Sequence, residues 1–317
     1  MILVVSYPGE EHTDAVVALL QAAGRQVARI DLADYPGRYG LDLRWDREVL
    51  RLMLGTGDGP VDLDGVKAVW WRRVRPFGCD PAVTDPHARQ FIASETHQAI
   101  GGVLSSLACP WMNPPGEDEA AHRKPFQWAV AREAGLRLPD TLVTTDPASA
   151  RAFLGERGGG RTVFKAFLAT EQGWRETRLV RDEDLAKLDT VRLAPVIFQE
   201  YVDGVDLRVT IVGGRVFAAE IDATGTSYPA DMRMVIGEAQ IRPVELPDEV
   251  EAALHRLMSR LGLVYGAIDL RRRPDGTHMF FEVNPAGQWM FVEQRTGLPI
   301  TAAVATTLQA MADGSAA

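Results

Sequence analysis

The chain of 317 residues can bury a substantial core and is long enough for two or three structural units. Its 46% hydrophobic and 24% charged residues are typical of a globular protein, and no hydrophobic stretch approaches the ~18 residues of a membrane span. The net charge of −9 argues against binding to nucleic acids or anionic membranes, so an anionic ligand would need a local basic site.

The cysteines and the start of the chain bear on its location. Cys79 and Cys109 are isolated and give neither a metal-binding spacing nor a disulfide framework. The hydrophobic start MILVVSY has no basic region before it, and Glu10 and Glu11 follow it. It is therefore predicted to be a strand and not a signal peptide. We expect a protein of the reducing cytoplasm.

Residues 1–115 are predicted to form a small α/β unit. Strands are expected at ILVVSY, QVARID and VKAVWWRRV, with a helix after the first strand and a longer helix over 87–107. The unit lacks a Gly-x-Gly-x-x-Gly turn, so the sequence does not support a dinucleotide site here. The helix residues expected to be buried are Val16, Leu19, Leu20 and Ala23, then Phe91, Ile92, Ala99, Val103 and Leu104.

The Asn113–Gly116 segment is the predicted boundary to a second unit, residues 116–195. A helix is expected to begin near Lys124, followed by the strand TLVTT. The next helix is predicted to have Asp146 as its N-cap and Pro147 at its first position.

Residues 196–317 are predicted to form the third unit. It contains the strand PVIFQEYV and a hairpin, LRVTIVGGRVFAAEI, that turns at Gly213 and Gly214. A helix over 247–261, two further strands and a terminal helix complete the unit.

Those two further strands carry a candidate metal site. Glu282 and Asn284 are two residues apart, so in a strand they share a face, with Phe281 and Val283 packing behind them. Asp269 lies on the preceding strand, across the turn at Pro-Asp-Gly. Hard oxygen donors suit Mg²⁺, which usually binds through one or two carboxylates and substrate phosphates. The alternative is that these residues only solvate the strand ends.

Lysine is rare in this chain, so each lysine is a candidate for a position where a compact positive charge is required. Only four of the 34 basic residues are lysines, and a compact ammonium binds phosphate as a point charge. Lys165 lies in the hydrophobic strand TVFKAF and needs a partner for its charge. Lys124 begins a helix, and its alternative is an exposed surface residue. Lys67 and Lys187 are interpreted as surface residues.

These features occur in the order used by the ATP-grasp superfamily. Beyond it, the chain resembles the peptide maturases of microviridin-type, or graspetide, biosynthesis. The WWRR and GQW segments distinguish this family from other ATP-grasp ligases. The matching segments are VWWRRV at 69–74, WMNPP at 111–115, KPFQWAVAREAGLRLPDTLVTTDP at 124–147, FQEYVDGVDLRVTIVGGRVFAAEI at 198–221, Asp231-Met232-Arg233, and FEVNPAGQW at 281–289 followed by TGLPI.

The resemblance implies an α/β (α+β) ATP-grasp fold with an N-terminal pre-ATP-grasp α/β domain over 1–115, a central subdomain over 116–195 and a C-terminal subdomain over 196–317. Two features depart from the family. Met232 stands where the family more often has Trp, and the loop at 168–177 is too divergent for its phosphate contacts to be assigned.

The resemblance also implies a role for each matching residue. Lys124 and Lys165 would contact the ATP phosphates. The adenine pocket would be lined by Gln199, Glu200, Tyr201 and Val202, with main-chain groups of Tyr201 and Val202 at the base edge. Asp206 would lie near the ribose, and the Mg²⁺ ligands would be Asp269, Glu282 and Asn284.

The implied chemistry is the activation of a carboxylate, because its oxygen is a poor leaving group until it is phosphorylated. ATP would convert the carboxylate to an acyl phosphate. Arg208 would stabilise the charge on this intermediate, an effect worth about 3 kcal/mol in comparable sites. Its alternative is a structural ion pair with Asp206 or Glu220. Arg233 is a second candidate cation.

In the family both reacting groups belong to a ribosomal precursor peptide with a leader and an acidic core. Its Asp or Glu side chains are joined to Ser or Thr as esters, or to Lys as amides. A homodimer is also expected. Arg72, Arg73 and Arg75 could attract the acidic peptide, but we favour an exposed strand edge paired with nearby acids. Trp70, Trp71 and Trp289 are interpreted as packing residues.

Two other functions remain as alternatives. An ATP-grasp ligase acting on free amino acids or on a protein C-terminus would use the same ATP site, but the WWRR and GQW segments favour the maturase. The other alternative is a catalytically silent nucleotide-binding module. It is disfavoured because both lysines and all three candidate metal ligands are present.

Overall fold

The computed structural model describes residues 1–45, 50–157, 161–167, 177–223 and 237–315. These residues form helices and four sheets, which agrees with the predicted α/β (α+β) class. No helix in this part of the chain is long and hydrophobic enough to cross a membrane.

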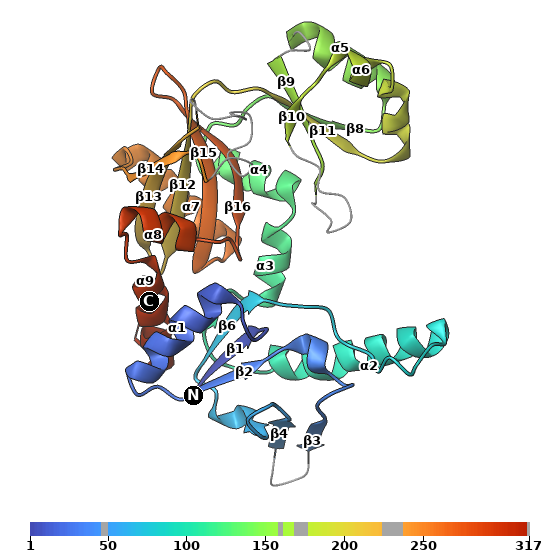
Figure 1. The fold of residues 1–317 in the computed structure, drawn as a ribbon, viewed down its shortest axis with the longest axis vertical. Helices are drawn as coiled ribbons and strands as arrows, with labels where there is room; N and C mark the ends of the chain where they lie inside the picture. Colours follow the sequence, from blue (N-terminus) through green and yellow to red (C-terminus); the bar gives the residue numbers. More distant parts are fainter. Residues whose placement is uncertain (46–49, 158–160, 168–176, 224–236, 316–317) are drawn as a thin grey trace.

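The N-terminal unit is built on a parallel sheet with the strand order β2-β1-β6-β7. Its strands are β1 (Ile2–Ser6), β2 (Val27–Ile30), β6 (Ala68–Arg73) and β7 (Trp111–Met112). Every residue of β1 is buried, as expected for an inner parallel strand that is covered on both faces. Helix α1 (Glu11–Ala22) packs against α9 (Ile300–Ala312), which joins this unit to the C-terminal end of the chain (Figure 1).

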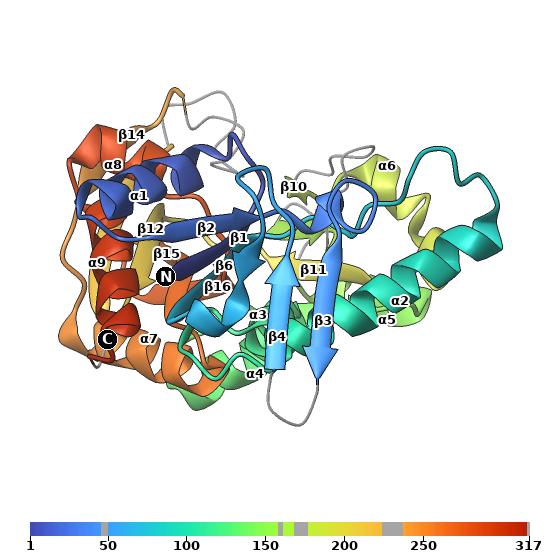
Figure 2. The same ribbon diagram turned by 90° about the horizontal axis from the view of Figure 1, so that it is seen from below.

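Helix α2 (Pro86–Ser105) projects from the parallel sheet (Figures 1 and 2). Val103 and Leu104 near its C-terminal end are buried as predicted, but Phe91 is 65% exposed. The prediction for Phe91 was wrong because the first half of the helix extends beyond the core that covers the second half. In α1, Val16 and Leu20 are buried, whereas Leu19 is exposed.

A small antiparallel sheet in the N-terminal unit was not predicted. Figure 2 shows its two longer strands, β3 and β4, side by side. Its elements and the neighbouring 3-10 helices are β3 (Leu41–Trp45), β4 (Leu50–Leu54), β5 (Val61–Asp62), η1 (Leu32–Asp34) and η2 (Leu63–Gly65).

The central region begins with α3 (Pro115–Ala121) and α4 (Lys124–Glu133) and continues into a second sheet, ordered β10-β9-β11-β8. Asp146 caps α5 as predicted, since its carboxylate accepts hydrogen bonds from the N–H groups of Ala148 and Ser149. The remaining elements are β8 (Thr141–Thr144), α5 (Pro147–Arg157), β9 (Thr162–Lys165), β10 (Arg178–Leu179), α6 (Asp182–Leu185), η4 (Leu188–Leu193) and β11 (Val196–Glu200).

The C-terminal sheet is antiparallel, with the order β14-β13-β12-β15-β16. The predicted hairpin turn is confirmed, because Gly213 and Gly214 join β12 to β13 with φ angles of +51° and +79°. The elements of this region are β12 (Val205–Val212), β13 (Arg215–Asp222), β14 (Gln240–Pro243), α7 (Asp248–Leu261), β15 (Tyr265–Arg272), β16 (His278–Asn284), α8 (Met290–Thr296) and α9.

The two faces of the C-terminal sheet have different partners. Leu207 and Ile268 share a hydrophobic core with residues of α4 and α7. On the opposite face, Tyr265 and Ala267 share a core with β1, β6, α8 and α9. Side chains alternate between the faces of a strand. Arg208 on β12 and its strand partner Asp269 on β15 therefore lie on the same face of the sheet as Tyr265.

Candidate active site

Three charged residues form a row across the C-terminal sheet. Arg208 of β12 is the strand partner of Asp269 on β15, and Asp269 is the partner of Glu282 on β16. Directly paired residues of antiparallel strands point to the same face, and Asn284 is two residues from Glu282 on that face. The structure thus brings the three candidate metal ligands together. The side chains of Asp269 and Glu282 are only 16% and 24% exposed.

A β-bulge lies beside this row. Asp269 pairs with Glu282 and Leu270 pairs with Phe280, so Phe281 is an extra residue on β16. Its ring lies 5.8 Å from Lys165 Nζ and 5.7 Å from Arg271 Cζ, measured to the ring centroid. The prediction that Phe281 packs behind the metal ligands was wrong, because the bulge turns its side chain toward these two cations.

Lys124, the first residue of α4, forms an ion pair with Glu282. Helix α4 is fixed against β16 by two side chains. Gln127 donates to Val283 O at 2.8 Å and accepts from Val283 N at 3.0 Å, and Trp128 Nε1 donates to Phe281 O at 2.9 Å. Lys124 therefore has a defined position over the candidate metal ligands.

Lys165 is the last residue of β9, in the central sheet. Its ammonium donates a hydrogen bond of 3.0 Å to Gln199 Oε1, and the Gln199 amide donates to Thr141 Oγ1 at 2.8 Å. Lys165 Nζ also lies 5.9 Å from the ring centroid of Trp128 on α4. Lys165 and Lys124 come from different elements, β9 and α4, but both lie beside the same stretch of β16, at Phe281 and Glu282.

The residues predicted to contact the base and the ribose extend from the end of β11 to the start of β12. Arg271 of β15 and Arg273 of the turn after it hold this segment. Asp206 is 7% exposed and forms a bidentate ion pair with Arg271, with both N–O distances 2.8 Å. Arg271 also donates to Val202 O at 3.0 Å. Glu200 forms an ion pair with Arg273. The segment is thus tied to the strand that carries Asp269.

Tyr201 lies in the same segment, with its ring centroid 5.9 Å from Arg271 Cζ. Its main-chain N–H donates to Arg161 O at 2.7 Å. Arg271 was not identified from the sequence. Its position two residues after Asp269, on the same face of β15, was a signal that could have identified it.

Arg208 has two anchors. Nη1 donates to Asp269 Oδ1 at 2.7 Å and Nη2 donates to Gln288 O at 2.8 Å. The alternative partners expected from sequence are engaged by other arginines: Asp206 by Arg271, and Glu220 by Arg242 and Arg272. Arg208 is only 8% exposed, and its Nε has no hydrogen-bond partner among the described residues.

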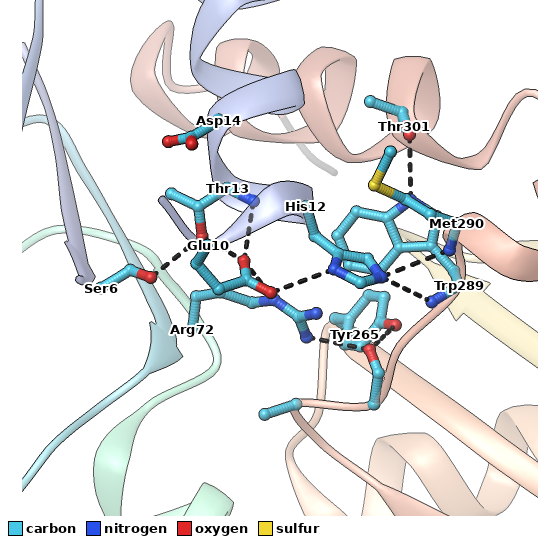
Figure 3. A network of polar contacts seen from close by, with 12 residues as sticks. Ser6, Glu10, His12, Thr13, Asp14, Arg72, Tyr265, Trp289, Met290 and Thr301 are labelled. Atoms are coloured by element: carbon cyan, nitrogen blue, oxygen red, sulfur yellow. Dashed lines mark hydrogen bonds and ion pairs between the residues drawn. The ribbon is translucent and has the colours of Figure 1, made fainter. Parts of the chain in front are cut away.

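Arg72 of the WWRR segment is not at the surface. Its side chain is fully buried, donates to Gly287 O at 2.9 Å and lies 4.6 Å from the ring centroid of Trp289 (Figure 3). Both interpretations of Arg72 as a surface residue were wrong, because β6 is an inner strand, between β1 and β7. Burial lowers the pKa of its guanidinium. The packing roles of Trp70 and Trp289, 2% and 0% exposed, are confirmed.

Part of the predicted site lies outside the described residues. This applies to the candidate cation Arg233, to its neighbours Asp231 and Met232, and to positions 168–176 of the predicted loop.

The donors present suit a hydrated Mg²⁺ bound together with phosphates. Asp269 and Glu282 provide carboxylates and Asn284 an amide, and a ligand set of this size leaves positions for phosphate oxygens and water. Within the described residues there is no cluster of three or more His, Cys, Asp or Glu side chains that could hold a metal by itself. Lys124 and Lys165 are within reach of the same region as point charges for a triphosphate.

Comparisons with known proteins identify a family model and several solved structures that the chain resembles. Residues 1–119 match the family model described as the MvdD pre-ATP grasp domain. No curated protein sequence matches the chain significantly.

Three solved structures are similar over nearly the whole chain. The macrocyclase MdnC from Microcystis aeruginosa MRC, bound with the precursor peptide MdnA, has a TM-score of 0.86 and 30% identity, covering 97% of this chain and 98% of MdnC. The macrocyclase MdnB from the same organism has a TM-score of 0.81 and 27% identity, with coverages of 97% and 98%. The ATP-grasp ligase PsnB, in complex with a phosphomimetic variant of a minimal precursor, Mg and ADP, has a TM-score of 0.79 and 26% identity, with 98% of each chain covered.

Proposed function

The chain belongs to the family of ATP-grasp ligases that macrocyclise ribosomal precursor peptides, and from this premise we propose how its residues carry out the reaction. It is an ADP-forming ligase that uses ATP and Mg²⁺. It activates Asp or Glu side chains of a precursor peptide and joins them to Ser or Thr as esters, or to Lys as amides. The observation that carries the assignment of roles is the row of Arg208, Asp269 and Glu282, with Lys124 on its end.

Asp269, Glu282 and Asn284 are proposed to hold Mg²⁺. When bound, the cation neutralises phosphate charge and helps to orient the γ-phosphoryl group for in-line transfer. Lys124 and Lys165 approach the same region from α4 and β9, and they are proposed to contact the phosphates from two sides.

The nucleotide base is proposed to lie against the segment Gln199 to Val202. The N–H of Tyr201 donates to Arg161 O, and the carbonyl of Val202 accepts from Arg271. We therefore assign the contacts with the edge of the base to the Tyr201 carbonyl and the Val202 N–H. Glu200 is assigned to the rim of this pocket, where Arg273 fixes its carboxylate. Asp206 is assigned to the ribose, where the bidentate ion pair with Arg271 would orient its carboxylate.

Arg208 is proposed to stabilise the transferred phosphoryl group and the acyl phosphate. Its guanidinium is nearly buried and already fixed by Asp269 and Gln288, so little reorganisation is needed when negative charge develops. Arg233 is proposed as a second cation for the same intermediate, on the basis of family resemblance.

Three further assignments are proposals of the same kind. The unit boundaries are placed at 1–115, 116–195 and 196–317. The protein is expected to act as a homodimer in the cytoplasm, on a substrate with a leader and an acidic core. Light scattering of the purified protein tests the dimer, and a monomeric mass at assay concentration would exclude it.

The nucleotide product tests the reaction class. The protein is incubated with ATP and Mg²⁺ in the presence of either an acidic peptide encoded beside its gene or a mixture of free amino acids. ADP release that depends on the peptide is expected. Release of AMP would contradict activation through an acyl phosphate. ADP release that depends only on free amino acids would contradict the proposal and favour the alternative ligase.

A further inference from the structure

The GQW loop, residues 287–289, is held by side chains from the N-terminal unit and by its own neighbours. Gly287 O accepts from Arg72 Nη1 at 2.9 Å and from Tyr265 OH at 2.7 Å. His12 Nε2 accepts from the N–H groups of Trp289 and Met290 at 3.2 and 3.3 Å (Figure 3). Arg72 and His12, which hold the first and last residues of the loop, precede those residues by 215 and 277 positions.

One buried carboxylate lies next to both of these supports, with a hydrogen bond to His12 and an ion pair with Arg72. Because His12 Nε2 accepts two N–H groups, the ring proton is on Nδ1, which donates to Glu10 Oε1 at 3.0 Å. The other oxygen of Glu10 lies 3.8 Å from Arg72 Nε and accepts from Thr13 N at 2.8 Å. Glu10 is 5% exposed and His12 is also 5% exposed, so this arrangement is closed to solvent.

Between the two supported ends lies the carbonyl that anchors Arg208. Gln288 O accepts from Arg208 Nη2 at 2.8 Å. The other anchor of Arg208 is Asp269, a proposed metal ligand, and a bound cation would draw charge away from that contact. The Gln288 carbonyl is a neutral main-chain group whose position depends on the loop, so it would hold Arg208 whether or not the cation is bound.

We propose that Arg72 and His12, which flank the carboxylate of Glu10, are positioning residues that fix the Gln288 carbonyl and through it the guanidinium of Arg208. This role rests on the proposed function of Arg208. It gives a role to the WWRR and GQW segments, which distinguish the family. Arg72 of WWRR donates to the carbonyl of Gly287 in GQW, and the next carbonyl, that of Gln288, accepts from Arg208.

The test compares three variants with a matched control. Arg72→Met removes the donor to Gly287, and His12→Ala removes the acceptor for Trp289. His12→Gln keeps an acceptor oxygen at about the place of Nε2. The control, Arg29→Met, removes another arginine of the N-terminal unit, one that pairs with Asp14. We expect kcat for peptide ligation to fall on the order of tenfold in R72M and H12A, with Kd for ATP within about threefold of wild type. H12Q and R29M should retain most of kcat.

Two further measurements separate positioning from a loss of folding. R72M added to Arg208→Ala should lower kcat no further, because the two residues act in series. In protein without ligands, hydrogen exchange at the amides of Trp289 and Met290 should be faster in H12A than in wild type and in H12Q. Equal kcat in R72M and wild type, or an additive loss in the double variant, would overturn the inference. If wild type itself does not ligate, the proposed function fails instead.

Discussion

Lys124 and Glu282 form an ion pair although they are 158 positions apart in the chain. Arg208 and Asp269 form a second pair beside it, so two cations neutralise the two carboxylates proposed to bind the metal. The row of Arg208, Asp269 and Glu282, taken together with Lys124, therefore has no net formal charge. This explains how two carboxylates can lie opposite each other on neighbouring strands while both are mostly buried. It also places Lys124, the lysine proposed to bind phosphate, directly beside a proposed metal ligand.

Replacing Glu282 by Gln keeps the shape of the side chain but removes the charge. We expect kcat to fall by about 100-fold or more, and the Mg²⁺ concentration needed for half-maximal rate to rise. Steady-state kinetics over a Mg²⁺ titration measures both. Glu249→Gln, at an exposed position of α7, should leave both values unchanged. A fully active E282Q enzyme would exclude this residue as a metal ligand.

The two lysines of the site should be distinguishable from those at the surface. Lys124→Met and Lys165→Met are each expected to weaken ATP binding by roughly tenfold, or about 1.4 kcal/mol, through loss of a point charge on the phosphates. Calorimetric titration with ATP and Mg²⁺ measures this. Lys187→Met, on the exposed surface, provides the comparison. If all three variants bind ATP alike, the phosphate assignment is wrong.

Arg208 should not be replaceable by lysine. Its planar guanidinium contacts Asp269 and Gln288 at once, and a lysine ammonium cannot reproduce this geometry. Both Arg208→Lys and Arg208→Ala are expected to lose about 3 kcal/mol of transition-state stabilisation, roughly a 100-fold fall in kcat. Single-turnover measurement of ADP formation tests this. A near-normal rate for R208K would point to a purely structural ion pair.

Gly287 is predicted to be intolerant of a side chain. A Cβ atom there would lie 2.4 Å from Ala267 Cβ and 3.0 Å from Arg208 Nη2. Gly287→Ala should therefore destabilise the fold by about 1–3 kcal/mol and also lower kcat by displacing Arg208. Urea unfolding and kinetics measure the two effects. Gly101→Ala in α2, where a Cβ would meet nothing within 4 Å, should be neutral or stabilising.

Glu10 should make stability depend on acidic pH. Burial raises the pKa of Glu10, but hydrogen bonds from His12 and Thr13 and the charge of Arg72 outweigh it and lower the pKa from 4.5 to about 2. Because the pKa is lower in the folded protein, this stabilisation is complete above pH 4.5 and is lost as the pH falls toward 2. The loss amounts to about 3 kcal/mol.

The check is the difference in free energy of unfolding between wild type and Glu10→Gln, measured by urea unfolding at several pH values. This difference should be largest above pH 4.5 and shrink as the pH is lowered. Glu11→Gln, at an exposed position of the same helix, should show no such trend. A difference that does not vary with pH would show that Glu10 does not titrate as described.

The sequence predicts the site best where the geometry is local. The i and i+2 spacing of Glu282 and Asn284, with Asp269 on the adjacent strand, was enough to place three oxygen donors on one face. The contact between Lys124 and Glu282 was not predicted, because it depends on how α4 docks on β16 through Gln127 and Trp128.

The sequence failed where neighbours from other units decide the environment. Arg72 lies in a strand with several arginines, which suggests an exposed edge, but β7 covers that edge and Trp289 covers the guanidinium. No pattern near Glu10 or His12 indicated that they support a loop 277 positions later. The bulge at Phe281 has no proline or glycine to mark it in the sequence.

The central claim is that this enzyme uses ATP to close side-chain rings in a precursor peptide. Its most direct test is the intact mass of an acidic peptide encoded beside the gene, after incubation with the protein, ATP and Mg²⁺. The account predicts a product lighter by one water for each ring, one ADP released per ring, and no change with E282Q. A peptide of unchanged mass with the wild-type enzyme, across all neighbouring short reading frames, would contradict it.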